Sequence, residues 1–174
     1  MTIRPAKSAD HKALWDMLRP VFRAGETYAV KRDISRGAAL ELWCAAPRAT
    51  YVMEEQGKLL GTYYIKTNAQ GGGAHVCNCG YITAPEARGK GVARAMCERS
   101  QQQAVTLGYK AMQFNMVLAS NSGALALWQR LGFETVGHLP RVFDHPRDGL
   151  VDGHVMYKWL GQDDPQDDQH QPKA

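Results

Sequence analysis

A short basic turn with two glycines stands directly before a helical pattern in this chain. The stretch "APEARGKGVARAMCERS" (residues 84–100) places glycines on both sides of Lys90 and arginines nearby. The first amides of a helix have no partner inside the helix, and the helix dipole adds partial positive charge there. Glycine has no Cβ, so an anion can approach its backbone closely. The turn is therefore a candidate phosphate-binding site.

Two common phosphate motifs do not account for this turn. It lacks the G-x4-G-K-[ST] spacing of a P-loop, and it follows the fourth predicted strand without G-x-G-x-x-G. From this stretch alone, an ordinary basic surface loop is the alternative. The order of the surrounding elements has to decide between the two interpretations.

The hydrophobic pattern predicts strands and helices in the order β-α-α-β-β-β-α-β-α-β-β. This order indicates an α/β fold, a mixed sheet with helices on its faces. In the helix expected from about Ser35, we expect Ala39, Leu42, Trp43 and Ala46 on one side. Residues 1–160 are expected to form one domain, and the polar, acidic segment 161–174 is expected to be a disordered tail.

Composition and charge exclude several classes of protein. The 174 residues suffice for one well-cored domain. No apolar run reaches the roughly 18 residues of a membrane helix, and the first residues lack the apolar core of a signal peptide. We therefore expect a soluble, cytoplasmic protein without a membrane partner.

The net charge of +4 is unevenly distributed. The last 13 residues hold four Asp and one Lys, a net −3, which leaves +7 on residues 1–161. Because the basic residues are scattered, with no base-stacking motif, a small phosphorylated ligand fits better than nucleic acid. The four cysteines lack the spacing of a disulfide framework or a zinc site, so we expect free thiols and no metal.

Two motifs in the right order resemble the GNAT superfamily of N-acetyltransferases. In "YITAPEARGKGVA", Arg88, Gly91 and Ala93 fill the family pattern [QR]-x-x-G-x-[GA]. Downstream, "NSGALALWQRLGFETVG" is similar to the second hallmark of the family, an Asn and a small residue before a helix ending in G-F. The predicted elements match that fold over roughly residues 2 to 160, and the resemblance implies acetyl-coenzyme A (acetyl-CoA) as the donor substrate.

The same resemblance implies where the donor lies. Its pantetheine arm would pair with the backbone of Tyr81, Ile82 and Thr83, as an added strand does. Asn121 would hydrogen-bond the arm near its far end, and it is equally suited to a plain helix N-cap. The pyrophosphate would lie on the amides of the turn, flanked by basic side chains: Arg88, Gly89, Lys90, Gly91, Val92, Ala93 and Arg94.

For catalysis, Glu26 and Asn121 are the candidates, with Glu26 as base, either directly or through water. A solvated loop carboxylate is the alternative for Glu26, and His75 is a weaker candidate base. Many relatives carry a tyrosine on the last helix as acid for the leaving thiolate, whereas this chain has Trp128, which is expected to pack in the core. An indole is no useful proton source, so no single acid is assigned.

The acceptor is expected to be a small amine. "VCNCGY", "FNMVLASNSGALALWQRLGF" and "GETY" resemble a subgroup that includes fungal N-acetyltransferases of azetidine-2-carboxylate and proline analogues. This implies acceptor contacts from Asn78 and Asn115, together with Glu26 and Tyr28 of the "GETY" loop. The segment "PRVFDHPRDGLVDGH" is interpreted as a long connection that could cover the site.

Two other functions compete with this hypothesis: acetylation of a protein N-terminus or lysine, and a coenzyme A-binding module without turnover. A homodimer is compatible with the resemblance.

Overall fold

The computed structural model describes residues 1–161, so the predicted tail lies outside the described residues except for its first residue. The predicted order of elements is confirmed. The strands and helices are β1 (Thr2–Pro5), α1 (His11–Ala24), α2 (Arg36–Leu40), β2 (Ala49–Glu55), β3 (Lys58–Thr67), β4 (Val76–Thr83), α3 (Val92–Thr106), β5 (Ala111–Leu118), α4 (Ser122–Arg130), β6 (Glu134–His145) and β7 (Gly149–Trp159).

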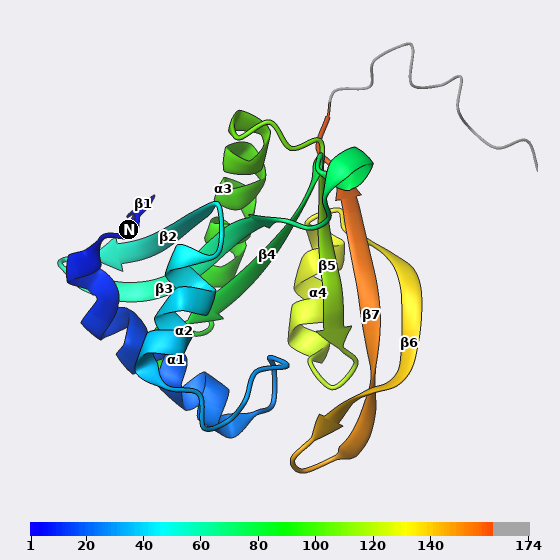
Figure 1. Cartoon of the computed structure of the whole chain (residues 1–174), viewed down its shortest axis with the longest axis horizontal. Helices are drawn as coiled ribbons and strands as arrows, with labels where there is room; N and C mark the ends of the chain where they lie inside the picture. The colour runs from blue at the N-terminus through cyan, green and yellow to red at the C-terminus, as the bar shows by residue number, and fades with distance from the viewer. Residues whose placement is uncertain (162–174) are drawn as a thin grey trace, which may run out of the picture.

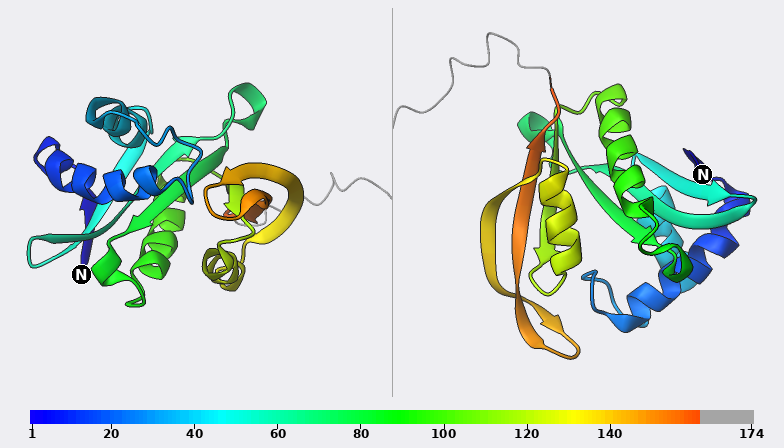
Figure 2. Two further views of the ribbon diagram at one scale, coloured as in Figure 1. Left: turned by 90° about the horizontal axis from the view of Figure 1, so that it is seen from below. Right: turned by 180° about the vertical axis from the view of Figure 1, so that it is seen from behind.

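These strands form one seven-stranded sheet in the order β1-β2-β3-β4-β5-β7-β6. All neighbours are antiparallel except β4 and β5, which run parallel. Helices α1 and α2 lie on one face of the sheet and α3 and α4 on the other (Figure 2). The α/β class expected from the sequence is therefore confirmed, with a mostly antiparallel sheet.

The central parallel pair is short. Only two backbone pairs join β4 to β5, Val76 with Ala111 and Cys77 with Met112. Both strands continue beyond these pairs, and they diverge toward their carboxyl ends (Figure 1). Ligands of α/β sheets bind in such openings at the carboxyl ends of strands. The divergence is the feature of the fold that positions the site.

A β-bulge in β5 lies beside this opening. The register with β7 passes from Phe114 opposite Met156 to Val117 opposite His154, so β5 holds one extra residue. A bulge bends its strand and turns nearby side chains to new directions. The bulge therefore changes the course of β5 next to the point where β4 leaves it.

The core consists of apolar side chains packed on both faces of the sheet. Trp43 and Tyr63 are among the largest fully buried side chains. The Trp43 indole N–H donates to the Thr62 hydroxyl at 3.1 Å, so its polar atom is satisfied inside the core. All four cysteines are free, and three of them are buried.

Two details of the sequence interpretation were wrong. The helix expected from about Ser35 leaves α-helical geometry after Leu40 and continues as a π-helical turn, Glu41–Ala45. The wider π turn advances each residue by a smaller angle, so Leu42 is exposed although Ala39 and Trp43 are buried. The segment interpreted as a long connection is mostly strand, because β6 runs to His145 and β7 begins at Gly149.

Candidate active site

A cleft of about 970 Å³ occupies the opening between β4 and β5. We call it the β4–β5 cleft. The cleft lies mainly between β4 and β5, with further walls from helices, turns and β3. Its lining residues are residues 78–83 of β4, residues 114–118 of β5, Tyr64 and Lys66 of β3, Val21 and Phe22 of α1, residues 26–30 of the α1–α2 connection, Leu42 and Trp43 after α2, Arg88, Gly89 and Ala93 around the start of α3, residues between 120 and 128 around α4, and His145, Arg147 and Asp148.

The turn before α3 presents several unpaired amides. Gly91 is the N-cap of α3, and the first helical bond runs from the Ala95 N–H to its carbonyl. Within residues 1–161, no acceptor is recorded for the N–H groups of Gly89, Gly91, Val92, Ala93 and Arg94. The predicted amide set is thus free apart from Lys90, whose N–H donates to the Ala87 carbonyl at 3.4 Å.

The two glycines of the turn are required by backbone geometry. Gly89 and Gly91 have φ of 74° and 76°, the left-handed region that favours glycine. A Cβ built at either position would meet no atom of residues 1–161 within 4 Å, so this part of the chain leaves the space above the turn open. Open space over unpaired amides at a helix N-terminus fits a phosphate group.

The basic side chains around the turn differ in whether they form an ion pair within the protein. Arg94 forms an ion pair with Glu98 on the next turn of α3, at 2.9 Å. No ion pair is recorded for Arg88 or Lys90 within residues 1–161. Arg88 lines the cleft, whereas Lys90, Gly91, Val92 and Arg94 are not among the residues that line it. Val92 is buried in the core, so its expected contribution is its amide alone.

The β4 edge proposed for the pantetheine arm lies along this cleft. Tyr81, Ile82 and Thr83 all line it, and within residues 1–161 β4 has no strand partner on the β5 side beyond Cys77. One carbonyl of this edge already accepts a side-chain bond, because the Tyr28 hydroxyl donates to the Tyr81 oxygen at 2.7 Å. Tyr28 thereby ties the α1–α2 connection to β4.

Trp128 closes the cleft from α4. It is 8% exposed, and its ring lies 5.1 Å from that of Tyr81 and 5.2 Å from that of Phe114, centroid to centroid. The expectation of core packing is confirmed, and the indole also lines the cleft. The Tyr81 phenol is no substitute acid, because its hydroxyl contacts Ser100 of α3 and burial raises its pKa well above the usual range.

Asn78 lies at the apex of the cleft. Its amide Nδ2 donates to the Gln113 carbonyl at 2.9 Å, and the Tyr64 hydroxyl donates to its Oδ1 at 3.4 Å. Burial raises the pKa of Tyr64 to about 12, so this phenol stays protonated as a donor. The Asn78 amide is therefore satisfied by its neighbours in this structure, and the residue still lines the cleft.

The two other asparagines have different surroundings. Asn115 is exposed at the bulge of β5, where its Nδ2 donates to Asn68 at 2.8 Å and its Oδ1 accepts from Gln113 at 2.9 Å. Asn121 caps α4, since its Oδ1 accepts the Ala124 N–H at 3.2 Å. Both line the cleft, so the N-cap role of Asn121 is confirmed and is compatible with a ligand contact.

The candidate bases are separated by the fold. Glu26 lines the cleft and pairs with Arg147 at 3.2 Å, which links the α1–α2 connection to the β6–β7 turn. His75 does not line the cleft; its Nδ1 contacts the Gly72 carbonyl at 3.1 Å, and its ring lies near Trp159. His75 precedes β4 at the end where β4 and β5 are still paired, so the structure does not bring this candidate base to the cleft.

Comparison with known proteins identifies the family of this arrangement. Residues 12–133 match the acetyltransferase (GNAT) family. The chain belongs to the GNAT family.

A GCN5-related N-acetyltransferase from Kribbella flavida shares 38% identity, with a TM-score of 0.85, over 91% of this chain and 96% of that chain. The yncA acetyltransferase from Salmonella typhimurium, solved with acetyl-CoA, is similar in fold, with 22% identity and a TM-score of 0.81 over 94% of this chain and 96% of that one.

N-acetyltransferase aca1 of Schizosaccharomyces pombe is 34% identical over 110 residues, which are 62% of this chain and 52% of that protein. Protein SPT10 of Saccharomyces cerevisiae is 26% identical over 106 residues, 58% of this chain and 17% of that protein. The chain spans about half the length, or less, of these curated relatives.

Sequence reasoning missed part of the cleft. Tyr64, Lys66, His145, Arg147 and Asp148 all line it. The last three stand at the turn of the β6–β7 hairpin, and only the length of that hairpin brings them to a site formed by β4 and β5. Tyr64 and Lys66 lie on β3, where their alternation with buried residues shows only that they share a face.

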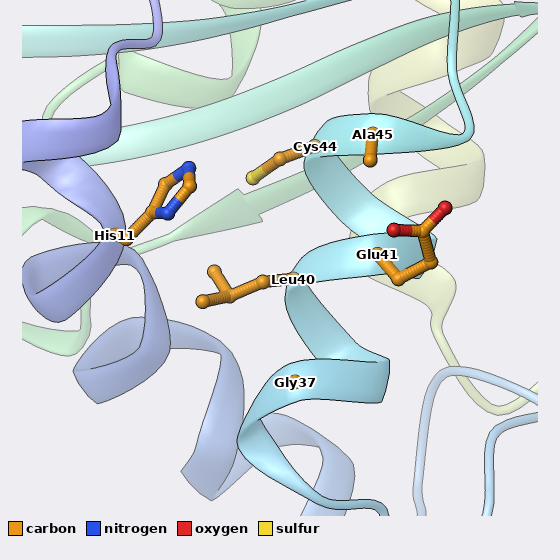
Figure 3. A pocket seen from close by; sticks show the side chains of 6 residues that line it. All are labelled: His11, Gly37, Leu40, Glu41, Cys44 and Ala45. Atoms are coloured by element: carbon orange, nitrogen blue, oxygen red, sulfur yellow. The ribbon is translucent and has the colours of Figure 1, made fainter.

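A second, smaller pocket lies between α1 and the turn after α2, and none of the predicted site residues lines it. Figure 3 shows His11 and Cys44 facing each other across it. Burial raises the pKa of the Cys44 thiol to about 11, so it stays a protonated, unreactive thiol at neutral pH.

Within residues 1–161 no cluster of three His, Cys, Asp or Glu side chains is arranged to hold a metal. In the same residues, no helix combines the length and the apolar character that membrane crossing requires.

Proposed function

We propose that this GNAT protein is an acetyl-CoA-dependent N-acetyltransferase acting on a small primary or secondary amine, such as an amino acid or an amino-acid analogue. One observation carries the proposal: the unpaired amides before α3 and the unpaired edge of β4 meet in the same cleft. The first suits a pyrophosphate and the second suits an amide-containing arm.

The residues present fit the donor. The amides of Gly89 and of Gly91 to Arg94 would hold the pyrophosphate, with Arg88 and Lys90 adding positive charge. The backbone of Tyr81 to Thr83 would hold the arm, and Asn121 is the candidate for its far end. Acetyl-CoA supplies a thioester carbonyl activated toward amines, and amides of the β4 edge could polarise it.

The acceptor would enter at the other end of the cleft. There the Glu26–Arg147 ion pair joins the α1–α2 connection to the β6–β7 turn. A bridge of this kind narrows access, which favours a small acceptor over a folded protein. Asn78, Asn115, Glu26 and Tyr28 line the region and remain the proposed acceptor contacts.

The test is mass spectrometry of a pool of small amines, amino acids, proline analogues and short peptides after incubation with the protein and acetyl-CoA. We expect a small-amine product heavier by one acetyl group. Acetylation of the peptides alone would favour the protein-acceptor alternative. Bound acetyl-CoA without any product would favour a non-catalytic module, which the absence of a tyrosine at Trp128 would then explain.

A further inference from the structure

A lysine on β3 reaches the β4–β5 cleft without a carboxylate partner. Lys66 lines the cleft and is partly buried. Within residues 1–161 no ion pair and no hydrogen bond of its ammonium group is recorded. We propose that Lys66 binds a carboxylate of the acceptor, so that free amino acids are preferred over amines without an anionic group. This inference rests on the proposed function.

The other basic side chains of the cleft have a partner or a proposed one. The Arg147 guanidinium pairs with Glu26 at 3.2 Å. Arg88 stands beside the unpaired amides of the turn before α3, where the donor pyrophosphate is proposed to lie. Among the lysine and arginine side chains of residues 1–161 that line the cleft, Lys66 is therefore the one whose charge is left for the acceptor.

The strand register places Lys66 beside Asn78 at the apex of the cleft. In the antiparallel pair of β3 and β4, Lys66 is opposite Asn78, and Tyr64 is opposite Gly80. Opposite residues project from the same face of a sheet, and so do residues two apart on one strand. Lys66, Tyr64 and Asn78 therefore share one face, and all three line the cleft.

The Tyr64 ring holds the ammonium group at this place. Lys66 Nζ lies 5.5 Å from the centroid of the ring, within the range of a cation–π contact. The ring packs edge to face against Trp43, with 4.9 Å between the centroids. A cation–π contact offsets only part of the cost of taking an ammonium from water, whereas a carboxylate would add charge-assisted hydrogen bonds. The Lys66 ammonium is thus positioned but not neutralised.

The place of Lys66 along the cleft separates it from the donor phosphates. The turn before α3 follows Thr83, whereas Asn78 lies five residues earlier on β4. At about 3.3 Å per residue, these five residues span roughly 17 Å along the strand. The proposed pantetheine site on Tyr81 to Thr83 lies between the two. Lys66 is therefore on the side of this arm away from the pyrophosphate, where an acceptor would approach the thioester.

A carboxylate subsite distinguishes free amino acids from two other classes of acceptor. Simple amines have no anionic group, and the N-terminal residue of a peptide has an amide in place of its α-carboxylate. Neither could neutralise Lys66, and a site built for a charged partner rejects molecules that lack it. The subsite therefore selects acceptors that carry a carboxylate within reach of the reacting amine.

Lys66→Met and Lys66→Arg test the subsite by removing and keeping the charge. Methionine keeps an unbranched apolar chain against Tyr64, and arginine keeps a cation with hydrogen-bond donors. The probes are the amino acids and proline analogues of the amine pool, each paired with its carboxamide, and products are followed by mass spectrometry. The ratio of kcat/KM for the acid to kcat/KM for the amide is compared between variants, because the intrinsic reactivity of each amine then cancels.

We expect the wild-type protein to prefer the acids over their amides by about 10- to 100-fold, the value of one charge-assisted interaction. Lys66→Met should lower kcat/KM for the acids by this factor, mainly through KM, and should leave the amides within about threefold. Lys66→Arg should keep most of the preference. Acetyl-CoA affinity, measured by calorimetry, should be unchanged in both variants.

A matched control and a binding measurement complete the test. Lys110 is exposed and does not line the cleft, so Lys110→Met should leave every ratio unchanged. Calorimetric titration of the coenzyme A-bound protein with the best acid supplies a readout other than activity. We expect the acid to bind Lys66→Met more weakly than wild type by the same factor.

Two results would overturn the carboxylate subsite while the proposed function stands. One is a wild-type protein that acetylates the amides or simple amines as well as the acids. The other is a Lys66→Met variant that loses acids and amides equally, which would assign Lys66 a structural role. If the wild-type protein acetylated no small amine, the proposed function would fail, and the subsite with it.

Discussion

Asn78 Nδ2 donates to the Gln113 carbonyl oxygen at 2.9 Å across the point where β4 and β5 separate. The last backbone pair between the strands joins Cys77 to Met112, one residue earlier on each strand. A side-chain amide thus makes the contact that the next backbone pair would have made. Asn78 therefore continues the contact between β4 and β5 one residue past their last backbone pair, and it lies at the apex of the cleft.

Replacing Asn78 by alanine should destabilise the fold. The Gln113 carbonyl would lose its donor in a partly buried place, which costs about 1–3 kcal/mol. Urea unfolding measures this loss. The exposed Asn115→Ala is the matched comparison and should cost less than about 0.5 kcal/mol, as surface substitutions do. Equal losses of unfolding free energy in the two variants would show that the hydrogen bond between Asn78 and Gln113 does not stabilise the fold.

Gly91→Val should weaken acetyl-CoA binding without unfolding the protein. Its side chain would enter the open space over the amides, and one or two charge-assisted hydrogen bonds lost correspond to about 10- to 100-fold in affinity. Gly108→Val is the control, because Gly108 has φ of 90° and equally open surroundings, beyond the other end of α3. Calorimetry should show unchanged affinity in the control; unchanged affinity in folded Gly91→Val would contradict the phosphate site.

Asn115→Ala should raise the KM for the acceptor by about 3- to 10-fold, the value of one hydrogen bond, with acetyl-CoA affinity unaltered. The reason is its place at the bulge of β5, where it lines the cleft. Steady-state kinetics with both substrates varied separates the two effects. Equal losses for donor and acceptor would assign Asn115 a structural role through its bonds to Asn68 and Gln113.

Gly80→Ala should displace the Tyr64 ring from the cleft wall. A Cβ at this position would lie 2.6 Å from Tyr64 Cε1, its cross-strand neighbour, and the ring already packs against Trp43 at 4.9 Å. Overpacking of this kind costs about 1–3 kcal/mol. We expect a lower Tm and a higher acceptor KM. Gly37→Ala, in open space on α2, should not lower Tm.

Stability should fall in acid because of the pair between Arg4 and Asp10. Hydrogen bonds from the Arg4 guanidinium, at 2.7 and 2.9 Å, hold the pKa of Asp10 below its usual value. A lowered native pKa adds stability above the unfolded pKa of about 3.9, and this stability is lost as the pH falls through the native pKa. Unfolding of wild type and Arg4→Gln between pH 6 and 2 should show a shallower decline in the variant; parallel curves would refute the linkage.

The sequence was sufficient for the order of the elements and for the turn before α3. Both depend on local chemistry: alternation and helical spacing of apolar residues, and glycines where the backbone needs positive φ. Gly89 and Gly91 have that conformation, so this local inference holds. Their proposed role in phosphate binding stays a prediction.

The residues that meet at the acceptor end of the cleft could not be predicted from local sequence patterns. Glu26 and Arg147 meet across more than a hundred residues, because the β6–β7 hairpin is long enough to reach the α1–α2 connection. The partners of Asn78 depend on where β4 and β5 part, which no local pattern encodes. The exposed Leu42 shows a further limit, since the π-helical turn after α2 changes the helical phase.

The most direct test of the proposed donor site is an amide NMR titration of the protein with acetyl-CoA. If the β4–β5 cleft holds the donor, the amides of Gly89, Gly91 and Val92 and those of Tyr81 to Thr83 should shift together and saturate at one affinity. Shifts confined to other parts of the chain, or none in this set while calorimetry shows binding, would contradict the site.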